Sequence, residues 1–162
     1  MKGNDEARMT NDKGMTKSEV QNTRKDYDPF WDNGETALVR EEAAGGKRVY
    51  DLEERTARFG EAVIDFAKTI PQNSVTNRLI NQLVGAATSV GANYVEADDA
   101  VSKKEFLESI GTCKKETRET KHFLRMAVRA VPELKPGARK LWLEARELHL
   151  IFSKIWRSGK NE

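Results

Sequence analysis

The chain has 162 residues, of which 38% are hydrophobic and 33% charged, and its formal net charge is +2. This length fits about one domain, and the composition is typical of a globular or long-helical protein. No stretch approaches the ~20 apolar residues that a helix needs to cross a bilayer, so we expect a cytoplasmic protein without membrane contact. The single cysteine, Cys113, excludes an intramolecular disulfide and a multi-cysteine metal site.

Residues 1–47 are poor in the side chains that build a hydrophobic core. Their only Ile, Leu, Val or Phe residues are Val20, Phe30, Leu38 and Val39. So little apolar surface cannot offset the entropy lost on ordering the segment. We therefore predict a disordered N-terminal extension over residues 1–47 and a folded domain over residues 48–162, with Gly45-Gly46 at the boundary.

The extension contains one aromatic cluster, Tyr27-Asp-Pro-Phe-Trp31. It could be a docking motif that folds on a protein partner, or a spacer in which the aromatic residues occur by chance. The sequence does not decide between these alternatives.

Two amphipathic helices are predicted in the first half of the folded domain. The first begins after the N-cap residue Asp51 and ends at Pro71, with a core stripe at Leu52, Thr56, Phe59, Val63, Phe66 and Ile70. The second begins near Ser74 or Thr76, with a core face at Leu79, Leu83, Ala86, Val90, Tyr94 and Ala97.

Two further helices follow. The third opens at the capping-box pattern Ser102-Lys-Lys-Glu105 and ends before Pro132, with a stripe at Phe106, Ile110, Cys113, Thr117, Thr120, Leu124 and Ala127. The fourth has Pro136 in its first turn and a stripe at Leu141, Ala145, Leu148, Phe152 and Ile155. Four such helices joined by short connections favour an all-α, antiparallel, up-down-up-down four-helix bundle.

The second helix carries another stripe beside its core face. It is made of small or hydrogen-bonding residues: Arg78, Gln82, Gly85, Ser89, Ala92 or Asn93, and Glu96. Such residues permit close approach, so we expect this helix to be covered on two sides, either by polar contacts inside the bundle or by another subunit. The residues predicted for this polar network or interface are Arg78, Gln82, Ser89, Asn93, Glu96, Glu116 and Glu119.

The third helix separates its charges by sign. At 100° per residue, its cations fall at about 40 to 120° and its glutamates at about 180 to 260° from Thr117. The cations are Lys103, Lys114, Arg118, Lys121, Arg125 and Arg129, and the glutamates are Glu105, Glu108, Glu116 and Glu119. The simplest interpretation is a solvated helix whose ion pairs reach neighbouring helices.

Two sharper interpretations of this helix remain open. Flanks of opposite sign could meet head to tail between subunits and close a ring. Alternatively, the cationic row could follow the phosphates of RNA or DNA without reading base edges. The candidate nucleic-acid-binding residues are Lys114, Arg118, Lys121, Arg125 and Arg129. Trp142 and Trp156 could stack on bases if they were exposed, although aromatic residues at helical spacing are more often core or interface residues.

Enzymatic interpretations are disfavoured. Glu119-Thr-Lys-His122 matches the Glu-x-x-His motif of di-iron bundles, but His122 lies about 175° from the core centre at 100° per residue. The only other histidine, His149, has Arg146 three residues before it. Neither a phosphate-binding loop nor a Gly-x-Ser-x-Gly nucleophile motif occurs. We expect no catalytic residue, no metal and no cofactor.

Three blocks carry a family resemblance: DLEERTARFGEAVIDFAKTIP, QLVGAATSVGANYVEA and SKKEFLESIGTCKKETRETKHFLRM. From Tyr50 to Arg157 the chain resembles the bacterial four-helix-bundle proteins encoded by intervening sequences in 23S ribosomal RNA genes. That family is in turn similar to the accessory variability determinant of diversity-generating retroelements. The resemblance implies a four-helix bundle, a ring-shaped homopentamer and association with nucleic acid through basic surfaces.

Overall fold

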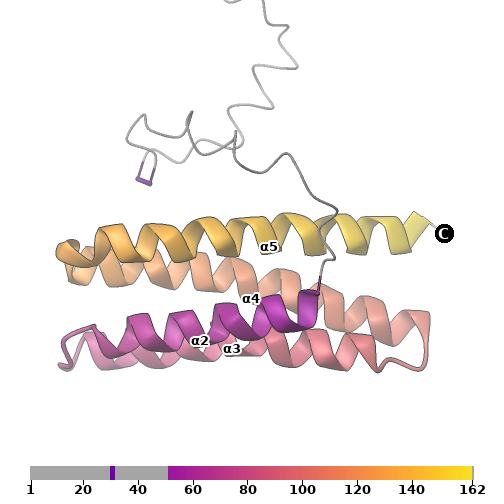
Figure 1. The fold of residues 1–162 in the computed structure, drawn as a ribbon, viewed down its shortest axis with the longest axis horizontal. Helices are drawn as coiled ribbons and strands as arrows, with labels where there is room; N and C mark the ends of the chain where they lie inside the picture. The colour runs from indigo at the N-terminus through magenta and orange to yellow at the C-terminus, as the bar shows by residue number, and fades with distance from the viewer. Residues whose placement is uncertain (1–29, 32–50, 162) are drawn as a thin grey trace, which may run out of the picture. The chain divides into compact units, whose positions relative to one another are not determined.

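The computed structural model describes residues 30–31 and 51–161, and the folded part is built from four long helices. In chain order these are α2 (Leu52–Lys68), α3 (Thr76–Asp98), α4 (Lys103–Ala130) and α5 (Lys135–Asn161), with the short 3-10 helix η1 (Pro132–Leu134) before α5. Successive helices run in opposite directions (Figure 1), which confirms the predicted up-down-up-down bundle. No strand occurs among the described residues.

The chain divides into two units, Met1–Lys47 and Arg48–Glu162. The expected disorder of the extension lies outside the described residues, apart from Phe30 and Trp31. Their rings form an edge-to-face pair with centroids 4.9 Å apart. Trp31 has no exposed surface.

Local hydrogen bonds set where the helices begin. The Asp51 carboxylate accepts from the Glu54 backbone N–H at 3.0 Å, which makes Asp51 the predicted N-cap of α2. The Ser102 hydroxyl likewise accepts from the Glu105 N–H at 3.2 Å at the start of α4. At α3 the Asn73 side chain accepts from the N–H of Thr76 at 3.0 Å. These bonds satisfy backbone donors that the first turn of a helix leaves unpaired.

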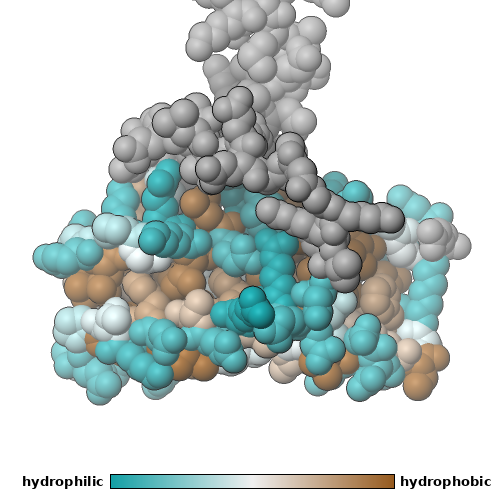
Figure 2. All heavy atoms as spheres, viewed as in Figure 1, coloured by the Kyte–Doolittle hydropathy of each residue, from teal (hydrophilic) through white to brown (hydrophobic). Residues whose placement is uncertain are grey.

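Most residues of the predicted core stripes are buried, whereas five are half-buried: Leu79, Tyr94, Phe106, Leu141 and Ile155. Residues with no exposed surface come from every helix and include Val63, Leu83, Ile110, Leu124 and Leu148. On the face shown in Figure 2, hydrophilic residues cover the outward sides of the helices and hydrophobic residues lie in the seam between α2 and α5. None of the described helices is long and apolar enough to cross a membrane.

Glycine lets α2 and α3 approach each other closely. A Cβ added at Gly60 would lie 3.7 Å from the Thr88 Cα, and one at Gly91 would lie 3.6 Å from the Thr56 hydroxyl. Thr56 is itself buried, and its hydroxyl donates to the Leu52 carbonyl at 2.8 Å. These two glycines therefore serve helix packing.

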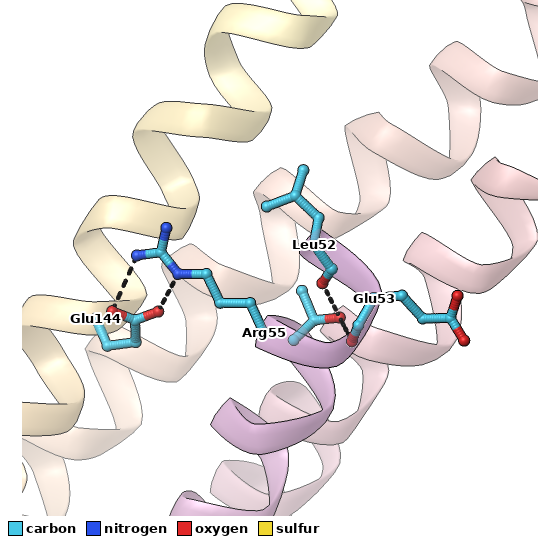
Figure 3. Close-up of polar contacts among 5 residues, drawn as sticks. Leu52, Glu53, Arg55 and Glu144 are labelled. Carbon is cyan, nitrogen blue, oxygen red and sulfur yellow. Dashed lines mark hydrogen bonds and ion pairs between the residues drawn. The ribbon is translucent and has the colours of Figure 1, made fainter. Parts of the chain in front are cut away.

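One ion pair links the first and last helices of the bundle. The Arg55 guanidinium donates to both carboxylate oxygens of Glu144, at 2.6 and 3.0 Å, as Figure 3 shows. The two side chains are only 28% and 35% exposed. By contrast, the Arg58–Glu54 pair lies within α2, and its side chains are 75% and 55% exposed. Two-pronged, partly shielded pairs hold their geometry better than exposed ones.

We predict that the Arg55–Glu144 pair stabilises the fold and that the Arg58–Glu54 pair contributes less. In a double-mutant cycle with Arg55→Gln and Glu144→Gln, urea unfolding should give a coupling free energy of about 1 kcal/mol. The matched cycle with Arg58→Gln and Glu54→Gln should give a clearly smaller one. Equal coupling free energies in the two cycles would contradict the prediction that partial burial strengthens the Arg55–Glu144 pair.

Candidate nucleic-acid interface

Helix α4 has two flanks of opposite charge. Its buried stripe includes Ile110, Cys113, Thr117, Thr120 and Leu124, and this stripe fixes the rotation of the helix about its axis. The cationic flank is consequently turned towards α5, and the glutamate flank towards the outer side of α3.

Contacts with α5 show where the cationic flank lies. The Lys114 ammonium is 4.5 Å from the ring centroid of Trp156, and the Lys121 ammonium is 5.2 Å from that of Trp142. Both distances are within the range of cation–π attraction. The cations of α4 thus run alongside an aromatic edge of α5.

His149 sits on the same edge of α5. Its Nδ1 is 3.0 Å from the Lys114 carbonyl oxygen and 3.5 Å from the Thr117 hydroxyl. Burial lowers the pKa of His149, and the positive charges of Lys121, Lys114 and Arg118 act in the same direction, against the hydrogen bond to the Lys114 carbonyl. With its pKa below the ordinary value, the imidazole is neutral at pH 7, and as a neutral ring it donates from Nδ1 to that carbonyl.

Three of the candidate nucleic-acid-binding residues have no acidic partner among the described residues. Lys114, Arg118 and Arg129 form no ion pair with any described residue. Between the two flanks of the same helix, Lys104 and Lys115 each lie within 4 Å of a glutamate, at 3.8 and 3.7 Å. The predicted nucleic-acid-binding residues therefore include positive charges that the fold leaves uncompensated.

Sequence reasoning missed the part that α5 plays in this surface. Three arginines form a row along α5: Arg139, Arg146 and Arg157. At 100° per residue they lie within about 20° of one another around the helix axis. The row is next to the edge formed by the tryptophans and His149, on the side farther from the core. Lys160 adds a fourth cation, with its ammonium 3.9 Å from the Trp156 ring centroid. The same angular count used for the third helix would have found this row. We call the two rows together the basic face; its residues are Lys114, Arg118, Lys121, Arg125, Arg129, Arg139, Arg146, Arg157 and Lys160.

The two tryptophans differ in depth. Trp142 is 6% exposed and belongs to the core, whereas Trp156 is half-buried. The condition that a base-stacking tryptophan be exposed is thus partly met by Trp156 and not by Trp142.

The opposite side of α4 is acidic. Burial raises the pKa of Glu116, and the neighbouring charge of Glu119 raises it further, with Lys115 opposing. Burial also raises the pKa of the Cys113 thiol to about 12, with smaller contributions from the charges of Glu96 and Glu116. Cys113 is therefore an unreactive core residue, and the three glutamates lie along the outer α3–α4 side.

The bundle does not cover the polar stripe of α3. Arg78, Gln82 and Glu96 are exposed, so the intramolecular alternative is wrong for them. Asn93 is half-buried, and its amide donates to the Ser89 carbonyl at 2.8 Å within α3 itself.

Gly85 is likewise not covered inside the bundle. A Cβ added there would meet nothing within 4 Å, so packing inside the chain does not explain this glycine. Between Arg78 and Glu96 the helix has no charged residue, which leaves an exposed uncharged face.

The di-iron motif does not assemble. His122 is exposed on α4, and its ring contacts Phe123 with centroids 5.3 Å apart. Within residues 30–31 and 51–161, no group of three or more His, Cys, Asp or Glu residues is placed to hold a metal ion.

These features define a class of protein: a four-helix bundle in which α4 has a cationic flank on one side and a glutamate flank on the other. The family model described as 23S rRNA-intervening sequence protein matches residues 50–150. The chain therefore belongs to that family, as the sequence blocks predicted.

A solved structure shares the fold. It is a crystal structure of a protein with unknown function from the S23 ribosomal protein family of Bacteroides thetaiotaomicron, with 19% sequence identity and a TM-score of 0.58. The similarity covers 65% of this chain and 97% of that chain. No curated protein matches the sequence.

We predict that protonation of His149 destabilises the protein. Its folded pKa lies below the unfolded value, so the unfolded state binds the proton more readily. The unfolding free energy should fall as the pH drops below about 6.5 and level off below the folded pKa. His149→Gln should reduce this acid-side loss in urea unfolding, whereas His122→Gln, which removes an exposed histidine, should keep it. A loss that persists unchanged in His149→Gln would contradict the assignment.

Proposed function

We propose that this protein is a non-enzymatic, self-assembling four-helix bundle that binds RNA or DNA through its basic face. The observation that carries the proposal is the coincidence of two cationic rows, one on α4 and one on α5, on one side of the bundle. The uncompensated charges of Lys114, Arg118 and Arg129 are its strongest members.

The geometry suits a phosphate backbone better than a specific base sequence. Cations repeat about once per turn along α4 and at wider intervals along α5, so they can follow a chain of negative charges. The residues of the basic face are all Lys or Arg, the side chains that most often contact phosphates. The affinity should accordingly depend strongly on salt and weakly on sequence. The proposal places the protein in the cytoplasm, where such ligands occur.

Removing two cations should weaken binding and flatten its salt dependence. For Arg118→Gln combined with Arg129→Gln, each lost phosphate contact should lower the slope of log affinity against log salt by about 0.7 to 0.9. Fluorescence anisotropy with labelled RNA and DNA at several salt concentrations measures both quantities.

The matched control removes the same number of charges elsewhere. Lys68 and Lys104 are exposed and paired with Asp65 and Glu108, so Lys68→Gln with Lys104→Gln should leave the slope nearly unchanged. An identical slope in the wild type and the basic-face variant would rule out phosphate contacts at these arginines.

A second candidate function is assembly alone. The acidic side of α4, with Glu116 and Glu119, and the neighbouring Glu96 of α3 face away from the basic side of the same subunit, an arrangement that suits head-to-tail contacts around a ring. A homopentamer is what the family resemblance implies. In this scaffold hypothesis the basic face is covered by the next subunit and binds no nucleic acid.

Charge exchange separates assembly from binding. If the two flanks meet, Glu116→Lys with Glu119→Lys should dissociate the oligomer in light scattering, because like charges then oppose each other across the contact. Adding Arg118→Glu and Arg129→Glu should restore it. If the basic face instead binds nucleic acid, the two lysine substitutions should leave binding intact, and the four-site variant should lose it. An oligomer of unchanged mass in both variants would contradict the head-to-tail contact.

A partner for the N-terminal extension remains part of the proposal. Residues 1–47 carry 8 basic and 10 acidic side chains around the Tyr27–Trp31 cluster, a composition suited to a docking segment that folds on a protein partner.

A further inference from the structure

One cluster on the basic face consists of a tryptophan and two lysines. The ring centroid of Trp156 is 4.5 Å from the Lys114 ammonium and 3.9 Å from the Lys160 ammonium. The first lysine comes from α4 and the second from the last turn of α5. The fold thus brings two like charges to one indole ring, where each is stabilised by the ring but repelled by the other.

Close approach of α4 and α5 holds the indole in place. A Cβ added at Gly111 would lie 3.3 Å from the Trp156 Nε1, so the indole edge lies against α4 where that helix has no side chain. At the next contact along α5, a Cβ added at Gly159 would lie 2.5 Å from a methyl carbon of Leu107. Larger residues at either position would force these groups to move. Trp156 is therefore a fixed ring at the edge of the bundle, with flexible lysine side chains beside it.

We propose that Trp156 stacks with an unpaired nucleobase while Lys114 and Lys160 contact the adjoining phosphates, so that the ligand of the basic face is a single strand. This inference rests on the proposed nucleic-acid binding and specifies its ligand. A phosphate near the two ammonium groups offsets their mutual repulsion, and their movement to it uncovers the indole ring. Stacking on tryptophan suits any base, because every base has an aromatic face.

A duplex fits this cluster less well. Its bases are already stacked on one another, and a ring packed against α4 at Gly111 cannot enter that stack. A duplex would meet only the cations of the basic face, and the tryptophan would add nothing to its affinity.

The sharpest test changes the ligand rather than the protein. Wild-type protein is titrated with an oligothymidylate of about 12 nucleotides and with a strand of equal length whose central nucleotides lack bases. Both ligands carry the same phosphates. The intact strand should bind about 10-fold more tightly, which corresponds to one base stacked on an aromatic residue. Equal affinity of the two strands would overturn the stacking role.

Variants locate the effect at Trp156. Trp156→Leu should lower the affinity for the intact strand to that for the abasic strand and leave duplex binding within about 2-fold, whereas Trp156→Phe should retain much of the preference. Lys114→Gln with Lys160→Gln should weaken both strands and reduce the salt slope. A base preference that persists in Trp156→Leu would move the stacking site elsewhere.

The outcomes also separate this inference from the function on which it rests. Salt-dependent binding with equal affinity for the intact and abasic strands would agree with the proposed function and contradict the stacking role. No binding of either strand at low salt would remove both.

Discussion

The buried stripe of α4 is the constraint on which both charged surfaces depend. Burial of a large apolar side chain stabilises a fold by about 1.5 to 3 kcal/mol, whereas an exposed ion pair contributes about 0 to 1 kcal/mol. Burying residues such as Ile110 and Leu124 therefore determines how α4 is rotated, even though this rotation aligns like charges along each flank. The segregation of charge follows from core packing, and repulsion along the cationic row is too weak to oppose it.

The sequence was sufficient for the fold because its signals are local and agree with one another. The apolar spacing, the caps at Asp51 and Ser102 and the prolines between segments all indicate the same four helices, and the structure places the helix ends at those signals. The apolar spacing of α4 also predicted on which side of the core stripe its cations lie. The 3-10 turn Pro132–Leu134 was not predicted, since a single turn has too few residues to show a period.

The candidate site was harder to predict because it depends on neighbours distant in sequence. Trp142 and Trp156 lie within about 40° of each other on α5 at 100° per residue, yet the first is buried and the second only half-buried. Helical phase gives the direction of a side chain but not what covers it. Gly85 shows the same limit, since it resembles Gly91 in sequence but faces open space while Gly91 packs on Thr56.

The two uses considered for the basic face compete for the same atoms. A head-to-tail neighbour that covers Arg118 and Arg129 would exclude a phosphate backbone from them. If nucleic acid occupies the basic face, assembly must use other surfaces, and the uncharged exposed side of α3 between Arg78 and Glu96 differs most from the charged remainder of the bundle. Its lack of charge lowers the desolvation cost of a protein contact. The ammonium groups of Lys114 and Lys160 already lie against the indole ring of their own subunit, so any anion that approaches them, from solvent or from a neighbouring subunit, competes with this cation–π contact.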